Sequence, residues 1–211
     1  MSNRSGETYV KQTEASKRDV DEVMPAIATA ADELGINPID VELIVVAIGP
    51  GGFTGLRTSI AMSKMIAYAT GAKVIPIETA IVIVQAENNG CGPYLVISCV
   101  KRDSFWLSRV DLRDDNWVCT SGLSNSNELD QHTRGVVGVY ADEFLPEHAR
   151  RYFEGQKIPL FTSTPNALTL LEVGIRQEKR GLTVDPHKLL PLYPRGPEAV
   201  RKWNARFRTN E

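Results

Sequence analysis

The segment Ile48–Lys64, which reads IGPGGFTGLRTSIAMSK, constrains the fold of this chain more than any other. Before it, Leu43–Ile48 is a continuous apolar run rich in β-branched residues, which predicts a strand covered on both faces, as in a parallel sheet. The chain then turns on glycines and enters a helix that we expect to be capped by Thr54 and to end at Gly71. A second β-branched strand over 73–78 would complete a β-α-β unit.

The turn itself is a candidate anion or nucleotide loop, because a helix that begins after glycines presents free backbone N–H groups. Its candidate residues are Gly49, Gly51, Gly52, Thr54 and Gly55. The P-loop template fails, since Gly55 is followed by Leu56 and Arg57 instead of Lys and Ser or Thr. The dinucleotide fingerprint lacks only its third glycine, and Glu78 ends the next strand, where a ribose-binding acid would stand. A Rossmann-like dinucleotide-binding enzyme is therefore an alternative, beside a plain strand-to-helix turn.

Composition narrows the class of protein further. The chain has 211 residues and a formal net charge of −2, which fits one large or two small soluble domains and gives no global case for nucleic acid or membrane binding. Its apolar runs are too short to span a bilayer, so we expect a cytoplasmic protein. The 3 histidines include no pair four apart, and the 3 cysteines form no C-x-x-C, so we expect no metal site.

Turn formers around 88–93 predict a boundary near residue 90, with a first domain over 1–90 and a second over 91–211 that includes a C-terminal tail. In the first domain we expect a short strand over Thr8–Thr13 and a helix that starts at Ser16, unless Pro25 moves its start. A further helix is expected over 79–87.

In the second domain, short strands over 94–99, 104–110 and 116–121 predict an antiparallel meander. Strands over 136–140 and 158–162, with a helix around 146–154 between them, should follow. A last helix, with Thr164 as its N-cap and Pro165 at its first position, should turn Leu168, Leu171 and Ile175 inward.

The run GPGGFTGLRTSIAMSKMIAYATGAKVIPIET resembles the signature of the bacterial TsaB (YeaZ) family. KRDVDEVMPAI and LPLYPRGPEAVRKW are similar to the family's first helix and closing segment. The resemblance implies an α/β fold of the two-lobed actin, Hsp70 and hexokinase class, each lobe built on an RNase H-like sheet. It also implies a non-catalytic partner in the synthesis of threonylcarbamoyladenosine (t6A) in tRNA, which pairs with a catalytic TsaD-type subunit and a TsaE-type ATPase. A nucleotide, if any, would be ATP or ADP at the interface of that complex.

The chain departs from the family pattern at two places. Family members carry a strand, an Asp-Thr-Ser phosphate loop and a hairpin before the position of Thr8, so we expect the first lobe to lack its first two strands and to leave a strand edge unpaired. At the start of the second lobe, Ile97–Phe105 lacks the Asp and Gly of the family's I-D-A-R-x-G pattern.

The resemblance also implies a partner surface on the helix that follows the glycine loop. We expect Arg57, Ser59, Met62, Met65 and Ile66 to contribute to it, with a homodimer when the chain is alone. Nine basic residues over 176–211, interleaved in part with Trp203 and Phe207, form a tail that would touch tRNA only within the complex. Helical spacing of the tail's apolar residues favours packing on the protein body over RNA contact.

Overall fold

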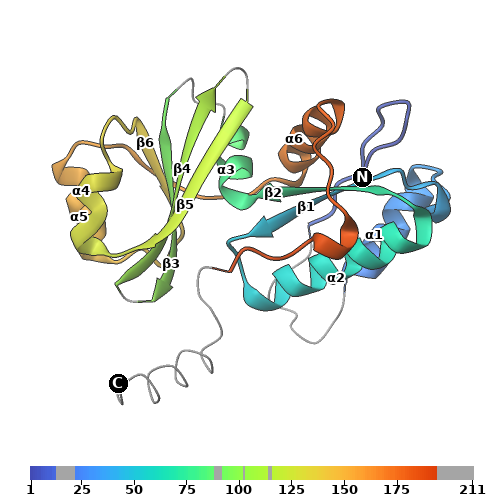
Figure 1. The fold of residues 1–211 in the computed structure, drawn as a ribbon, viewed down its shortest axis with the longest axis horizontal. Coiled ribbons are helices and arrows are strands. Elements are labelled where there is room, and N and C mark those ends of the chain that lie inside the picture. Colours follow the sequence, from blue (N-terminus) through green and yellow to red (C-terminus); the bar gives the residue numbers. More distant parts are fainter. Residues whose placement is uncertain (13–21, 88–91, 102, 114–115, 194–211) are drawn as a thin grey trace, which may run out of the picture. The chain divides into compact units, whose positions relative to one another are not determined.

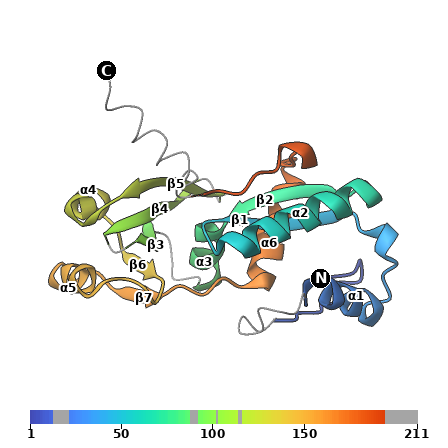
Figure 2. The same ribbon diagram turned by 90° about the horizontal axis from the view of Figure 1, so that it is seen from below.

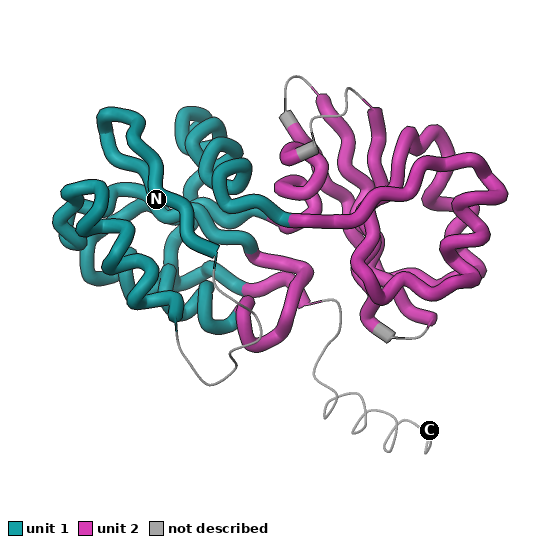
Figure 3. The backbone as a smooth tube through the Cα atoms, turned by 180° about the vertical axis from the view of Figure 1, so that it is seen from behind, with its two compact units in different colours: residues 1–47, 57–77, 165–190 teal, residues 48–56, 78–164, 191–211 magenta. Residues whose placement is uncertain are grey.

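The computed structural model describes residues 1–12, 22–87, 92–101, 103–113 and 116–193. The chain forms two compact units, each assembled from separate segments (Figure 3). Unit 1 contains residues 1–47, 57–77 and 165–190, and unit 2 contains residues 48–56, 78–164 and 191–211. This division differs from the expected one at residue 90, because 165–190 returns to the unit that holds the first strand. The basic tail beyond Tyr193 lies outside the described residues.

Unit 1 is built around a two-stranded sheet of β1 (Leu43–Gly49) and β2 (Lys73–Glu78). Helix α2 (Phe53–Thr70) connects the two strands, as the expected β-α-β unit requires. Figure 1 shows α2 on one face of this sheet and α6 (Ala167–Lys179) on the other. The outer edge of β2 carries a single antiparallel bridge, between Val74 and Val184.

The other edge of β1 has no strand beside it in the described part of the chain. The N–H of Lys73 donates to the carbonyl of Glu42, and backbone groups alternate along a strand, so Leu43, Val45 and Ala47 direct theirs to the open edge. Within β1 only Val46 and Gly49 are buried, and the other five residues are half-buried. The predicted strand is therefore confirmed in its position and in having a helix on each face, and its half-burial follows from the open edge.

Helix α6 is rotated relative to the prediction. Leu168 and Ile175 are 42% and 37% exposed, whereas Thr169, Val173 and Gly174 are the buried residues. A Cβ at Gly174 would lie 2.2 Å from the Cγ2 of Val45, so the missing side chain is what lets α6 approach β1 on that face. Leu171 is half-buried, so the prediction was wrong for Leu168 and Ile175, because a count of apolar side chains gives a glycine no weight.

The ends of the unit 1 helices also differ from expectation. The N-cap of α6 is Asn166, whose side chain accepts the N–H groups of Leu168 and Thr169, so Thr164 is not the cap. Helix α1 (Val23–Glu33) has Pro25 in its first turn, where the missing backbone N–H of proline breaks no hydrogen bond of the helix. The expected start at Ser16 lies outside the described residues.

The predicted strand over Thr8–Thr13 does not form in its described part, 8–12. Thr8 makes only an isolated antiparallel bridge with Ser2. The N–H of Tyr9 donates to the carbonyl of Met1, so these residues form a small loop closed on itself and add no strand to the sheet.

Unit 2 contains a five-stranded sheet in the order β5-β4-β3-β6-β7. Its strands and helices follow in chain order: α3 (Thr79–Glu87), β3 (Tyr94–Lys101), β4 (Ser104–Arg113), β5 (Asn116–Ser124), α4 (Leu129–His132), β6 (Gly138–Ala141), α5 (Glu147–Gly155) and β7 (Leu160–Thr162). Strands β3, β4 and β5 are the predicted antiparallel meander, and β6 and β7 extend it in parallel. Figure 2 shows α4 and α5 on one face of this sheet and α3 on the other.

The face of the unit 2 sheet that meets α4 and α5 forms a closed apolar core. Its most buried large side chains include Leu95, Ile97, Phe105 and Phe153, each 0% exposed. The alternation of β3 sends Tyr94 and Val96, which are also buried, to the opposite face. Across the described ranges of the chain, no helix is long and apolar enough to cross a membrane.

Candidate partner surface and glycine loop

The glycine loop depends on Gly49 more than on the glycines that follow it. Gly49 has φ +115°, and a Cβ there would lie 2.8 Å from the carbonyl oxygen of Leu192 and 3.0 Å from a methyl of Leu56. The N–H of Leu192 in turn donates to the carbonyl of Ile48 at 2.7 Å. This position therefore tolerates only glycine, because any side chain would strain the backbone and collide with it.

Gly51 and Gly52, unlike Gly49, need neither a positive φ nor a close backbone contact. Neither has a positive φ, Gly52 has open space where a Cβ would stand, and Gly51 would meet only the Leu56 side chain at 3.7 Å. Thr54 is not the helix cap either, since α2 begins at Phe53 and the N–H of Leu56 donates to the carbonyl of Gly52 at 3.0 Å. The loop glycines 51, 52 and 55 and Thr54 are exposed.

Helix α2 presents one continuous exposed face. Its members are Phe53, Arg57, Ala61, Met65 and Tyr68, which follow one another at steps of four, four, four and three residues. Phe53 is 55%, Met65 72% and Tyr68 85% exposed, although such side chains are usually buried. We call these five residues the α2 face.

The predicted interface residues divide between two sides of α2. Arg57 and Met65 belong to the α2 face, whereas Ser59, Met62 and Ile66 are half-buried. The predicted surface did not include Phe53. The steps of four and three residues that start at Phe53 could have identified it, because such residues share one side of a helix.

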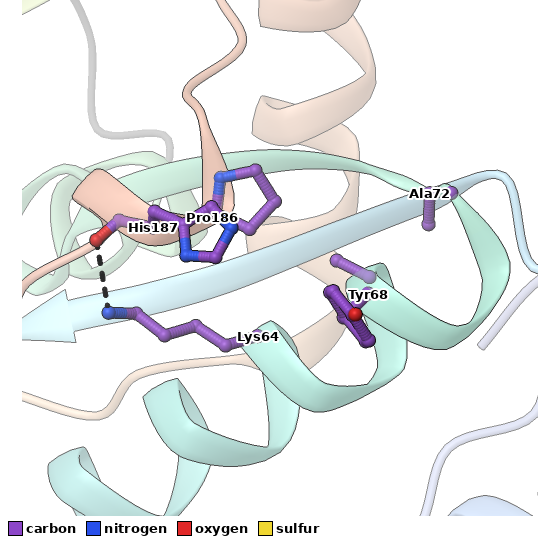
Figure 4. Close-up of a pocket in the computed structure, with 7 residues that line it drawn as sticks. Lys64, Tyr68, Ala72, Pro186 and His187 are labelled. Atoms are coloured by element: carbon purple, nitrogen blue, oxygen red, sulfur yellow. Dashed lines mark hydrogen bonds between the residues drawn. The ribbon is translucent and has the colours of Figure 1, made fainter.

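A groove opens beside the C-terminal end of α2 (Figure 4). Its lining comes from α2, from the turn after it and from the 3-10 turn Pro186–Lys188, and consists of Lys64, Ala67, Tyr68, Gly71, Ala72, Pro186 and His187. The Lys64 Nζ donates to the carbonyl of His187 at 3.4 Å. All these residues belong to unit 1.

In unit 2, Glu78 belongs to a partly buried network of polar side chains. The Ser121 hydroxyl donates to Glu78 Oε2 at 2.8 Å and shares a hydrogen bond of 2.8 Å with the hydroxyl of Ser108. Cys119 lies 3.3 Å from the same Ser121 oxygen, and burial raises the pKa of its thiol to about 12. Glu78, the acid that the dinucleotide fingerprint would use for ribose, thus accepts from Ser121 of β5, and Ser121 in turn is joined to Ser108 of β4.

Asp142 binds the backbone of the altered Ile97–Phe105 segment. Its Oδ2 accepts the N–H of Cys99 at 2.7 Å and its Oδ1 the N–H of Phe144 at 3.1 Å, so the carboxylate holds the ends of β3 and β6 together. The pKa of the Cys99 thiol is raised to about 12, mainly by burial and then by the neighbouring Asp142. A thiol with so high a pKa is a poor nucleophile at neutral pH.

A surface cluster of Ser126, His148 and Asp103 has the residue types of a hydrolase triad but a different geometry. Ser126 Oγ lies 2.7 Å from His148 Nε2, and Asp103 Oδ1 lies 3.6 Å from the same nitrogen. In a triad the carboxylate holds the other imidazole nitrogen, Nδ1, so that Nε2 can take the serine proton. Asp103 also accepts the Ser126 hydroxyl, so this cluster links the turn between β3 and β4, the 3-10 turn Ser126–Glu128 and helix α5.

Comparison with known proteins adds to this geometry. The family described as "TsaD: tRNA N6-adenosine threonylcarbamoyltransferase" matches residues 8–101. The chain is 30% identical over 208 residues to the tRNA threonylcarbamoyladenosine biosynthesis protein TsaB of Bacillus subtilis, with 93% of this chain and 86% of that protein covered. It is also 25% identical over 184 residues to an uncharacterized protein of Mycobacterium leprae, covering 87% of this chain and 46% of that one.

Two solved structures have a fold similar to that of this chain. A Pseudomonas aeruginosa protein described as similar to peptidase YEAZ superposes with a TM-score of 0.66 at 20% identity, covering 83% of this chain and 84% of that one. YeaZ from Pseudomonas aeruginosa superposes with a TM-score of 0.64 at 19% identity, covering 82% and 85%.

These findings define the class first: the chain is an α/β protein of the actin, Hsp70 and hexokinase fold class, as the sequence predicted. The likeness to the Bacillus protein extends over nearly the whole of both chains. The chain belongs to the TsaB (YeaZ) family.

Proposed function

We propose that this chain is a non-catalytic partner subunit in t6A biosynthesis and that it docks on a TsaD-type catalytic subunit through the α2 face. The observation that carries the proposal is the row of exposed Phe53, Met65 and Tyr68 side chains on one side of a single helix. Contiguous exposed apolar residues of this size mark interaction sites in soluble proteins. The printed function of the Bacillus relative supplies the pathway, and the match to the TsaD family over 8–101 supports a related partner.

Chemistry elsewhere in the described residues supports the non-catalytic role. The two described cysteines hold their protons at neutral pH, and the Ser126, His148 and Asp103 cluster lacks the arrangement for proton transfer from serine. The docking role needs no reacting group. It needs a rigid exposed face, which α2 offers over 18 residues.

The proposal includes the other partners that the family resemblance implies. A TsaE-type ATPase joins the pair, tRNA is contacted only in the assembled complex, and the chain forms a homodimer through the α2 face when alone. Because homodimer and heterodimer would use one surface, they compete, and addition of the TsaD-type subunit should dissolve the homodimer. ATP or ADP would enter at the complex interface.

Size-exclusion chromatography with light scattering tests the docking surface directly. The purified chain should co-elute with the TsaD-type subunit of the same organism, and Met65→Glu should abolish co-elution because it places a charge in the apolar face. Phe144→Glu is the matched control, since Phe144 is 71% exposed but lies in unit 2. A wild-type chain that never co-elutes, or a Met65→Glu chain that pairs normally, would overturn the proposal.

A further inference from the structure

The groove beside α2 has the size of a binding site for one or two side chains. Its volume is about 340 Å³, at the lower end of the range of about 300–1,000 Å³ seen for small-molecule pockets. The floor is apolar and close to the backbone, with Ala67, Gly71, Ala72 and Pro186 among its lining. Tyr68 belongs both to the groove and to the α2 face, so the two form one continuous surface.

Three polar side chains line the groove without a partner that matches their chemistry. Lys64 carries a positive charge, and in the described part of the chain its ammonium forms no ion pair and reaches only the carbonyl of His187 at 3.4 Å. Figure 4 shows the Lys64 side chain extended toward the turn that carries His187. The Tyr68 hydroxyl and the His187 imidazole likewise have no hydrogen-bond partner among the described residues.

These groups have in common that each can donate a hydrogen bond, and one of them is a permanent cation at neutral pH. A carboxylate is the complementary protein group, because it accepts from several donors and gains further from a charged one. The nearby Asp185 forms no ion pair with Lys64 in the described part of the chain, and its Oδ1 accepts the backbone N–H of His187.

A second copy of the chain is a poor source of that carboxylate along α2. The helix sequence FTGLRTSIAMSKMIAYAT contains no Asp or Glu, and its charged residues are Arg57 and Lys64. Two copies paired along α2 would therefore bring like charges together, which disfavours the complex. A different subunit that carries an acidic residue beside an apolar helix face fits better.

We infer that the groove of Lys64, Tyr68 and His187 receives an Asp or Glu side chain of the catalytic partner subunit, and that this contact favours the heterodimer over the homodimer. The inference rests on the proposed function, because it names the chemistry of the partner at the same surface. The apolar α2 face supplies contact area to either partner, and the groove supplies the discrimination between them.

The test measures the affinity of the chain for the TsaD-type subunit by calorimetry at low and high salt. Lys64→Gln should weaken binding at least about tenfold and reduce its salt dependence, because it removes the charge that attracts the carboxylate. Lys64→Glu should weaken it more, and Lys64→Arg should retain most of the affinity. Lys188→Gln is the matched control, an exposed lysine of the same turn outside the groove, and should change affinity less than about twofold.

Homodimer affinity of the same variants, from sedimentation, completes the test. Lys64→Gln should leave self-association unchanged or strengthen it, because it removes a repulsion. Unchanged heterodimer affinity and salt dependence in Lys64→Gln would overturn the groove inference, while loss of binding in Met65→Glu would still uphold the proposed function. Weakened self-association with an intact heterodimer would assign the groove to the second copy and overturn the inference. A wild-type chain without affinity for the TsaD-type subunit would overturn both.

Discussion

Strands β1 and β3 are both short, apolar and rich in β-branched residues, yet their surroundings in the fold differ. β3 lies between β4 and β6, and its Leu95 and Ile97 are fully buried. β1 has β2 on one side and no described strand on the other, and most of its residues are half-buried. An apolar run thus predicts that a strand forms, but the number of its neighbours decides how far it is buried.

The difference between the strands extends to their units. Unit 2 has a five-stranded sheet with a closed core under α4 and α5, whereas the described part of unit 1 has a two-stranded sheet with an open edge. Open edges and exposed apolar faces attract other chains. The groove and the greater part of the α2 face lie in unit 1, as this open edge does.

Amide hydrogen exchange should show the largest contrast between the two strands. The outward N–H groups of Val45 and Ala47 have no described partner and should exchange at least about a hundredfold faster than those of Leu95 and Ile97, which open only with the whole sheet. Exchange resolved by residue in NMR spectra measures this. Equal protection in β1 and β3 would mean that another segment covers the open edge.

Removing a large side chain from the unit 2 core should cost the most stability. Phe153 is 0% exposed and packs in the core with Leu95 and Phe105, so Phe153→Ala should lower the free energy of unfolding by about 3–5 kcal/mol. Phe144→Ala, at a side chain that is 71% exposed, should cost less than about 1 kcal/mol. Urea unfolding curves give both values, and similar costs for the two would contradict the closed core.

The glycine loop allows a matched comparison of Gly49 and Gly52, which are three residues apart in the sequence. Gly49→Ala should destabilise by about 1–3 kcal/mol, because it combines positive φ with a collision against the Leu192 carbonyl. Gly52→Ala has open space and ordinary φ, so it should stay within about 0.5 kcal/mol of the wild type. Thermal unfolding of the two variants measures both changes. Equal losses of stability would mean that the loop glycines are equivalent.

The smallest of these effects concerns the cap of α6. Asn166→Ala removes the acceptor of two backbone N–H groups and should cost about 1 kcal/mol. Thr164→Ala, at the position that the sequence had suggested, should leave the free energy of unfolding unchanged within about 0.3 kcal/mol. A larger loss in the threonine variant would restore the original assignment.

The sequence predicted much of the fold, because its strands and turns carry local signals. The meander β3-β4-β5, the β-α-β unit and the glycine that ends α2 all follow from β-branched runs and Gly positions. The orientation of α6 did not follow from such signals. Gly174 faces β1 because it lets the helix approach closely, and a count of apolar side chains does not detect this. The segment from Thr8 contains strand-forming residues, but Thr8 pairs only with Ser2 in an isolated bridge, a pairing that local sequence signals do not show.

The candidate site was predicted in part for a similar reason. Helical spacing identifies which residues share a side of α2, but it does not say which side the sheet covers. Arg57 and Met65 were therefore mixed with Ser59, Met62 and Ile66 from a different side. The groove escaped prediction entirely, because Lys64 and His187 are 123 residues apart in sequence and meet only through the fold.

The t6A content of tRNA, measured by mass spectrometry of nucleosides in cells of the source organism, tests the central claim most directly. Deleting the gene for this chain should lower t6A, and the wild-type chain should restore it. The account predicts that Phe144→Glu restores t6A as well, whereas Met65→Glu does not, although both folded proteins accumulate to equal levels. Unchanged t6A after the deletion, or full restoration by Met65→Glu, would contradict a subunit that acts through the α2 face.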